Sequence, residues 1–368
     1  MKAASLLREV GRDLATGTTR AVTFGTCLAI IVGALCIADL GTVRDILNSE
    51  REYRASGADI TILTATGRID GNACDQLAAA EGVAAAGAIR ESQARLSPRV
   101  LPDAPIPMSE ISPGFRHLVG APSRAGIALG PEAQRALAPR PGSQLAATTG
   151  VVRVAGSYAY PDDGRRAGLS YAALVTSITQ APFDECWVRQ WPQSDDVNSL
   201  LLLSMVPQVQ RPNGSPAGDS SSDSATEPPS FSQLNSAFGA RFAGLKSFEA
   251  RVTQWAPLVA ASASLVLGYV SIRMRRLQFA SALHAGVARS DHLLIALVET
   301  TAWVGCGLIV AFPAAAVTAA HAALQDRETM FLLGGAILLA AGVGATLGAF
   351  VAAVLTRERH LFRYFKDR

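Results

Sequence analysis

Four long apolar runs, separated by polar segments, set the organisation of the chain. They span residues 21–43, 252–272, 293–320 and 330–355. Each is long enough to cross a hydrocarbon core of roughly 30 Å, which takes about 20 helical residues. The polar interval 44–251 separates the first run from the second. The pattern predicts an α-helical membrane protein with four transmembrane helices in a 1+3 arrangement and one large domain between the first two.

Within residues 44–251 the pattern becomes mixed. ADITILT, residues 58–64, alternates like a strand, DGNACDQLAAAEGV, residues 70–83, reads as a helix, and VAAAGAIRE, residues 83–91, reads as a second strand. This order predicts a βαβ-type unit within a mixed α/β domain. Pro-rich loops are expected around residues 102–142, and further strand candidates lie at residues 150–160, 172–179, 185–191 and 199–209.

The ends of this domain have their own patterns. Residues 44–57 are charged and can continue the first helix beyond the bilayer. Residues 211–236 consist largely of Pro, Gly, Ser and acidic residues, which predicts a flexible linker. The following stretch, residues 236–255, contains no Pro and has helical spacing, so we expect a helical stalk that runs directly into the second span.

The distribution of Lys and Arg predicts the orientation. Basic residues are in excess in residues 1–20, 273–292 and 356–368, but not in residues 44–251 or in the short loop 321–329. Basic loops stay on the cytoplasmic side, so both termini are expected to be cytoplasmic and the large domain and the short loop extracytoplasmic. Residues 1–20 form either an amphipathic helix along the inner membrane surface or a polar leader. The first run fits a membrane anchor better than a cleaved signal peptide, because its apolar core is long.

Composition narrows the function classes. Hydrophobic residues make up 49% of the chain and charged residues only 17%, which suits a membrane protein better than a soluble enzyme. The sequence contains no phosphate-binding loop and no metal-ligand or catalytic motif. We therefore expect a non-catalytic chain with no cofactor or metal of its own and no nucleic-acid partner.

The cysteines separate by compartment. Cys74 and Cys186 are the two that fall in the expected extracytoplasmic domain, where oxidising conditions let disulfides persist. The pattern favours a disulfide between them over two free thiols. Cys27, Cys36 and Cys306 lie in apolar runs and read as small packing residues.

Two acidic residues interrupt the apolar runs. Asp39 is expected near the outer interface, where water can solvate it. Glu299 falls about one to two turns inside the third span on the cytoplasmic side. It either faces the helix bundle with a partner or extends to the lipid headgroups.

The basic segment RMRRLQFASALHAGVARSD, residues 273–291, lies between the second and third spans. As a helix it places Phe279, Leu283 and Val287 on one face. Arg275, Arg276 and Arg289 can then reach lipid phosphates or an acidic partner surface, and Ser290 and Asp291 can cap the next helix. Composition alone also allows a plain basic loop that does no more than fix the orientation.

Its spacing resembles the cytoplasmic segment of the MacB/FtsX-like ABC transporter permeases, also called type VII or mechanotransmission permeases. In that family, Glu-Phe-Ala precedes basic residues, Gly-Ala-Ser, a basic pair and a later Glu. Here Gln278-Phe279-Ala280 begins the segment, Gly286 follows, then Arg289 and Asp291, and Glu299 ends it. Gln278 replaces the family's first Glu, and the basic positions are only partly kept. The 1+3 layout resembles the same family.

The resemblance implies a permease subunit in the bacterial cytoplasmic membrane. Such a subunit pairs with a second permease, identical or not, and with two copies of a separate ATPase that binds ATP and Mg. Motion of the ATPases would pass through residues 273–292, the coupling helix, to the extracytoplasmic domain. The coupling residues would be Arg275, Arg276, Gln278, Phe279, Leu283, Gly286, Val287, Arg289 and Asp291.

Two functions follow from this resemblance. The first is export of an amphiphilic, antibiotic, lipid or peptide-like substrate. The alternative is an FtsX-like signalling subunit that activates an extracytoplasmic protein such as a cell-wall hydrolase.

Overall fold

The computed structural model describes residues 8–356 apart from residues 9, 14, 18 and 207–227. It divides into two compact units. The helical unit comprises Met1–Ser49 and Ala243–Arg368, and the sheet unit comprises Glu50–Phe242.

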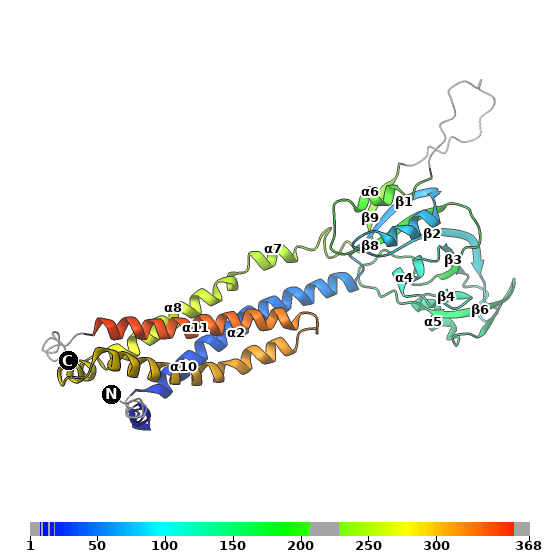
Figure 1. Cartoon of the computed structure of the whole chain (residues 1–368). Coiled ribbons are helices and arrows are strands. Elements are labelled where there is room, and N and C mark those ends of the chain that lie inside the picture. Colours follow the sequence, from blue (N-terminus) through cyan, green and yellow to red (C-terminus); the bar gives the residue numbers. More distant parts are fainter. Residues whose placement is uncertain (1–7, 9, 14, 18, 207–227, 357–368) are drawn as a thin grey trace, which may run out of the picture. The chain divides into compact units, whose positions relative to one another are not determined.

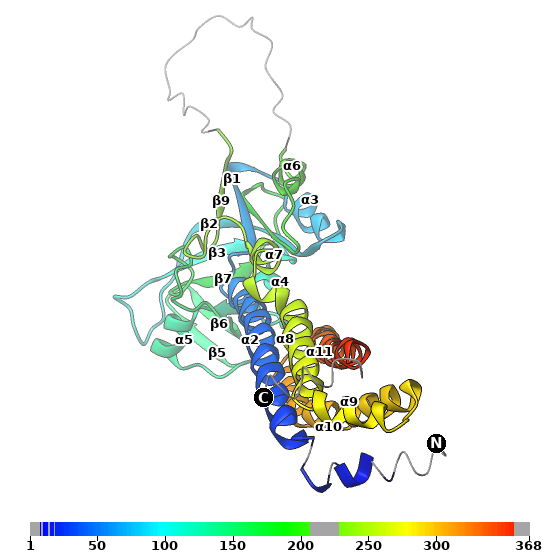
Figure 2. The same cartoon turned by 90° about the vertical axis from the view of Figure 1, so that its left-hand side faces the viewer.

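The described residues of the helical unit contain four helices that are long and apolar enough to cross a membrane. They are α2 (Ala21–Ala55, whose last turns belong to the sheet unit), α8 (Ala256–Arg273), α10 (Arg289–Ala320) and α11 (Arg327–Leu355). Figures 1 and 2 show them running alongside one another, with α11 packed on both α8 and α10. The shorter elements are α7 (Gly244–Glu249), a 3₁₀ turn η2 (Val252–Trp255) and α9 (Arg276–His284).

Small residues bring α8 and α11 into backbone contact. A Cβ added at Gly348 would lie 2.0 Å from the carbonyl oxygen of Leu265, and one added at Gly268 would lie 2.0 Å from that of Ala345. Gly344 and Gly348 form a GxxxG pair, a spacing that lets membrane helices approach closely. Van der Waals packing between backbones therefore holds this helix pair together.

The described part of the sheet unit contains a nine-stranded mixed sheet in the order β5-β6-β4-β7-β3-β2-β8-β1-β9. The pairs β3/β7 and β4/β6 are parallel, and the other neighbours are antiparallel. Its elements in chain order are β1 (Ile60–Ile69), α3 (Gly71–Gln76), η1 (Leu77–Ala79), β2 (Val83–Leu96), β3 (Ile106–Ile111), α4 (Phe115–Val119), β4 (Ile127–Leu129), α5 (Pro131–Leu137), β5 (Gln144–Ala147), β6 (Gly150–Ser157), β7 (Ala173–Thr176), β8 (Phe183–Gln190), α6 (Val197–Leu202) and β9 (Ser230–Gln233).

Alternation along β8 separates two cores on the two faces of this sheet. Trp187 packs with Ile62, Ile89 and Phe115 on one face. Its neighbour Cys186 packs on the other face, in the core that includes side chains of α3 and α6. Successive side chains of a strand point to opposite faces, so one strand serves both cores.

The structure corrects several expectations for the sheet unit. The predicted strand–helix–strand order holds for β1, α3 and β2, but β8 lies between the two strands and is antiparallel to both. The strand expected at residues 199–209 is wrong in its first part, because Val197–Leu202 form α6, in keeping with the good helix propensity of Leu, and its last residues, 207–209, lie outside the described residues. The loops expected at residues 102–142 contain β3, α4, β4 and α5. Pro107 is tolerated in β3 because it pairs with β2 beside a β-bulge.

The expected linker is too long at its C-terminal end. Most of it, residues 211–227, lies outside the described residues. Residues 230–233, however, form β9 and pair with β1 as an edge strand. Pairing with an exposed strand edge supplies hydrogen bonds that composition does not reveal.

In the helical unit the expected continuous stalk is also wrong. It is broken between α7 and η2, where Arg251 has extended backbone angles. Pro257 then lies in the first turn of α8. Proline is favoured there because it lacks the N–H that a helix interior needs, so it begins a new helix. Near the N-terminus, helical residues end in a turn at Thr16 and Gly17, so the expected helix over residues 1–20 does not extend to Arg20.

Candidate functional site

The segment predicted to be the coupling helix is shorter than expected. Residues 276–284 form α9, and the helix ends at Gly286, whose φ is +91°. The N–H of Gly286 donates to the carbonyl of Leu283, and that of Val287 donates to the carbonyl of Ala282. This is the Schellman arrangement, which requires a left-handed residue at the helix end. The end of α9 therefore explains why a glycine stands at position 286.

One face of α9 is buried. Phe279 and Leu283 are buried, whereas Gln278 and Gly286 are exposed. The ring of Phe279 meets the ring of His292 edge-on, with centroids 4.5 Å apart. Ile272, Ala296, Ala349, Ala352 and Ala353 complete the surrounding apolar cluster. Through Phe279, α9 packs against the beginning of α10 and the end of α11.

Two expectations for this segment are wrong. Val287 does not continue the face of Phe279 and Leu283, because the helix has ended before it. Ser290 and Asp291 do not cap the third span, since α10 begins at Arg289 with Ala288 as its N-cap. Asp291 lies in the first turn instead, where a negative charge still stabilises the helix dipole. Arg289 is exposed, and Arg276 is partly exposed.

Arg275 lies at the centre of a buried charged cluster. Its guanidinium donates from Nη1 to Glu299 Oε2 at 2.5 Å and from Nη2 to Asp13 Oδ2 at 2.7 Å. Its Nε donates to Gln278 Oε1 at 3.0 Å, and its charge lies 4.9 Å from the centroid of the Phe279 ring. The side chains of Arg275 and Glu299 are only 10% and 3% exposed.

This cluster resolves the two readings of Glu299. Its carboxylate faces the interior of the helical unit and has Arg275 as its partner. Asp13, from the N-terminal helical residues, is a third member that sequence reasoning missed. The amphipathic pattern of residues 1–20 placed a helix there, but nothing in it indicates which charge would turn inward. With two carboxylates and one guanidinium, the cluster joins α10, the start of α9 and the N-terminal segment.

A second buried ion pair lies at the other end of α8. Arg251 Nε donates to Asp39 Oδ1 at 3.1 Å, and Asp39 is 2% exposed. The expectation that water solvates Asp39 is therefore wrong. The 18 residues of α8 separate this pair from the Arg275 cluster, a helical length of about 27 Å at ~1.5 Å per residue. That length is close to the roughly 30 Å of a bilayer core.

In the sheet unit, a disulfide joins Cys74 on α3 to Cys186 on β8, with Cα atoms 5.9 Å apart. It fixes α3 to one face of the sheet. Cys36 is buried and Cys27 and Cys306 are exposed at the surface of the helical unit.

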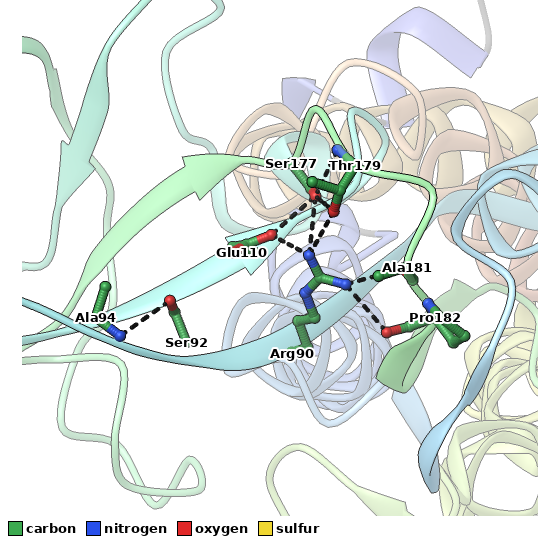
Figure 3. A network of polar contacts seen from close by, with 8 residues as sticks. All are labelled: Arg90, Ser92, Ala94, Glu110, Ser177, Thr179, Ala181 and Pro182. Atoms are coloured by element: carbon green, nitrogen blue, oxygen red, sulfur yellow. Dashed lines mark hydrogen bonds and ion pairs between the residues drawn. The ribbon is translucent and has the colours of Figure 1, made fainter.

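A polar network in the sheet unit was not anticipated (Figure 3). Arg90 on β2 pairs with Glu110, directly across from it on β3, and donates to Thr179 Oγ1 at 2.7 Å and to the carbonyl of Ala181 at 2.9 Å. Burial acts to raise the pKa of Glu110, but hydrogen bonds from Arg90 and Ser177 outweigh it and hold that pKa below its usual value. The network holds the loop between β7 and β8, in which Ile178 is 99% exposed.

The described residues contain no group of three or more His, Cys, Asp or Glu side chains that could hold a metal ion. The short helix α9 is held to α10 by an aromatic contact and a buried ion cluster, and it packs on α11 through the alanines of the apolar cluster.

Comparisons with known proteins gave no match to a family model or to a curated protein. Among solved structures, the chain is similar to the periplasmic region of MacB from Actinobacillus actinomycetemcomitans, with 10% identity and a TM-score of 0.31 over 41% of this chain and 83% of that one. It is also similar to the extracellular domain of the noncanonic ABC-type transporter YknZ from Gram-positive bacteria, with 14% identity and a TM-score of 0.27 over 38% of this chain and 88% of that one.

Proposed function

We propose that this chain is a permease subunit of an ABC transporter of the MacB/FtsX-like, mechanotransmission type. In this proposal a separate ATPase hydrolyses ATP, and α9 receives the resulting motion and passes it to α8 and α10. The sheet unit lies outside the cytoplasmic membrane, and both termini lie inside. The working assembly contains two permease subunits and two ATPases, and its cargo is an amphiphilic, antibiotic, lipid or peptide-like molecule.

The observation that carries this proposal is the attachment of α9. A plain basic loop has no need of buried contacts, but Arg275 is only 10% exposed and bonds to Glu299 and Asp13. Phe279 and Leu283 are buried beneath the helix. Because buried charges are costly unless paired, this geometry holds α9 in one position relative to α10. A segment fixed in this way can transmit force, while a loose loop would absorb it.

The exposed side of α9 supports the same role. On α9 Gln278 is exposed and Arg276 is partly exposed, and Arg289 is exposed at the start of α10, so this segment presents polar and basic groups at the surface of the helical unit. Such a surface suits contact with a soluble protein that carries acidic groups.

The test is co-purification. The chain, tagged at its C-terminus, is extracted from native membranes in mild detergent, and the proteins that accompany it are identified by mass spectrometry. We expect an ATPase subunit with its own phosphate-binding loop. The variant Leu283→Glu, which places a charge on the buried face of α9, should lose this partner, whereas Ser262→Ala on α8 should retain it. Recovery of no ATPase with the native chain would contradict the proposal.

A second function, FtsX-like signalling to an extracytoplasmic protein, is favoured by one observation. Ile178 is 99% exposed, yet its loop is held by the Arg90 network (Figure 3). A fixed loop with an exposed apolar side chain suits a protein contact, because little conformational entropy is lost on binding. If the native chain captured an extracytoplasmic protein, and Ile178→Asp abolished this capture but left ATPase association unchanged, the signalling role would be preferred.

A further inference from the structure

A cleft of about 500 Å³ opens on the face of the sheet unit that carries Trp187. Strands β1, β2, β3 and β8 form its floor, and the segment around residues 160–172 forms its wall. Clefts of several hundred Å³ are the size that small ligands and peptide side chains occupy.

The floor of the cleft contains a carboxylate beside an indole ring. Trp187 Nε1 donates to Glu185 Oε2 at 2.8 Å, which fixes the orientation of the carboxylate. Trp187 is 1% exposed, and the side chain of Glu185 is 14% exposed. An aromatic face next to an oriented carboxylate binds cations through the ring quadrupole and through charge-assisted hydrogen bonds.

A cation from the chain itself already occupies this position. Arg166 Nη2 lies 2.9 Å from Oε1 and 2.8 Å from Oε2 of Glu185. The same guanidinium lies 5.6 Å from the centroid of the Trp187 ring. Arg166 therefore makes the contacts that an incoming guanidinium or ammonium group would make.

The side chain of Arg166 can leave without movement of its backbone. Its N–H donates to the carbonyl of Leu234 at 2.8 Å, and its carbonyl accepts from Tyr160 Oη at 2.5 Å. Its side chain, by contrast, is 46% exposed. An exposed arginine has considerable rotamer freedom, and an exposed ion pair adds little stability. Release of the guanidinium thus requires side-chain rotation alone.

The other groups of the cleft also favour a cation. Three carboxylates line it, those of Glu91, Asp184 and Glu185, against the guanidiniums of Arg90 and Arg166. Arg90 is already paired with Glu110 outside the lining, so negative charge remains in excess.

The cleft also offers hydrogen-bonding groups to a ligand. Ser109 lines it and is only 9% exposed, and among the described residues its hydroxyl has no hydrogen-bond partner. The hydroxyls of Thr64 and Thr66 lie in the same lining. Together they can bind the polar backbone next to a charged side chain.

We propose that this cleft binds a basic peptide, one of whose guanidinium or ammonium groups displaces Arg166 from Glu185 and Trp187. Arg166 then acts as an internal competitor that lowers the affinity of the empty site. This role depends on the sheet unit alone and extends beyond the permease function.

The test measures the binding of tri-arginine amide by isothermal titration calorimetry to the full chain in phosphatidylcholine nanodiscs, whose lipid carries no net charge. We expect Arg166→Gln to bind the peptide at least fivefold more tightly than the native chain, because the internal competitor is gone. Glu185→Gln should bind it at least tenfold more weakly. Two exposed residues outside the cleft provide matched controls, Arg124→Gln and Glu81→Gln, and both should bind like the native chain.

The Arg166 variant makes the outcome decisive, because a loss of folding cannot raise affinity. If Arg166→Gln bound the peptide no more tightly than the native chain, the displacement would be disproved. Equal binding by the native chain, Arg166→Gln and Glu185→Gln would show that the peptide binds elsewhere. If tri-glutamate bound as well as tri-arginine amide, the site would not select cations, and the proposal would fail.

Discussion

Replacement of Arg275 by Gln tests whether the buried ion cluster holds α9 in place. The substitution keeps a polar side chain of similar reach but removes the charge that Glu299 and Asp13 share. These two carboxylates are 3% and 14% exposed, so water cannot replace the lost guanidinium easily. Two charge-assisted hydrogen bonds, of 2.5 and 2.7 Å, are lost with it.

The expected magnitude follows from the burial. Removal of one partner from a buried ion pair costs about 3–5 kcal/mol, mostly because the remaining charge is left uncompensated. We therefore expect Arg275→Gln to lower the free energy of unfolding of the helical unit by about 3–5 kcal/mol. Arg289→Gln, an exposed arginine at the start of α10, is the matched control and should change it by less than about 0.5 kcal/mol.

The assay is reversible unfolding in mixed micelles with increasing fractions of sodium dodecyl sulfate. It compares the native chain with Arg275→Gln and Arg289→Gln. A double-mutant cycle adds Glu299→Gln and the double variant of Arg275 and Glu299. In Arg275→Gln/Glu299→Gln one of the stranded carboxylates is neutral, so the double variant should lose less than the sum of the single variants by about 1–3 kcal/mol. Strict additivity, or a loss in Arg275→Gln no larger than in Arg289→Gln, would refute the role given to the cluster.

Three further predictions concern packing, the disulfide and pH. Gly348→Ala should destabilise the helical unit by about 1–3 kcal/mol, because its Cβ would overlap a carbonyl of α8. Gly335→Ala is the control and should not destabilise it, because its Cβ meets nothing within 4 Å. Unfolding in mixed micelles compares the two variants. Cys74→Ala/Cys186→Ala opens a loop with a sequence separation of 112 and should cost the sheet unit about 2–5 kcal/mol in thermal unfolding followed by circular dichroism. Burial raises the pKa of Asp59, so the folded sheet unit holds that proton more tightly than the unfolded chain and loses stability as pH rises through the folded pKa. Asp59→Asn should therefore raise Tm more at pH 7 than at pH 4, and an equal change at both would contradict this.

The sequence predicted the four long helices well, because the length of an apolar run is a local property. The positions where it failed depend on contacts between distant residues. The composition around β9 predicts a linker, because its strand partner, the edge of β1, is far away in the chain. Arg251 was placed inside a continuous stalk because its ion pair with Asp39 joins segments more than 200 residues apart in sequence.

In the candidate site, too, local features were predicted and contacts between distant residues were not. The spacing of Phe279 and Leu283 predicted one buried face of α9, and both are buried. The same spacing also predicted Val287 on this face, but the left-handed backbone of Gly286 ends the helix before Val287. The third member of the ion cluster, Asp13, came from a segment whose charges all looked solvent-facing. The GxxxG pair at Gly344 and Gly348 could have predicted the α8–α11 contact, but no such prediction was made from the sequence.

The two ion pairs that flank α8 bear on how the helical unit would carry force. At one end Arg251 bonds to Asp39 on α2, and at the other Arg275 bonds to Glu299 on α10. Between them the backbones of α8 and α11 are in contact at Gly268 and at its partners on α11. Side chains can adjust their rotamers under load, but touching backbones cannot. A displacement of α9 should therefore move α8 and α11 together as one rigid pair, so under the proposed function the small residues that allow this contact matter as much as the charged residues of the cluster.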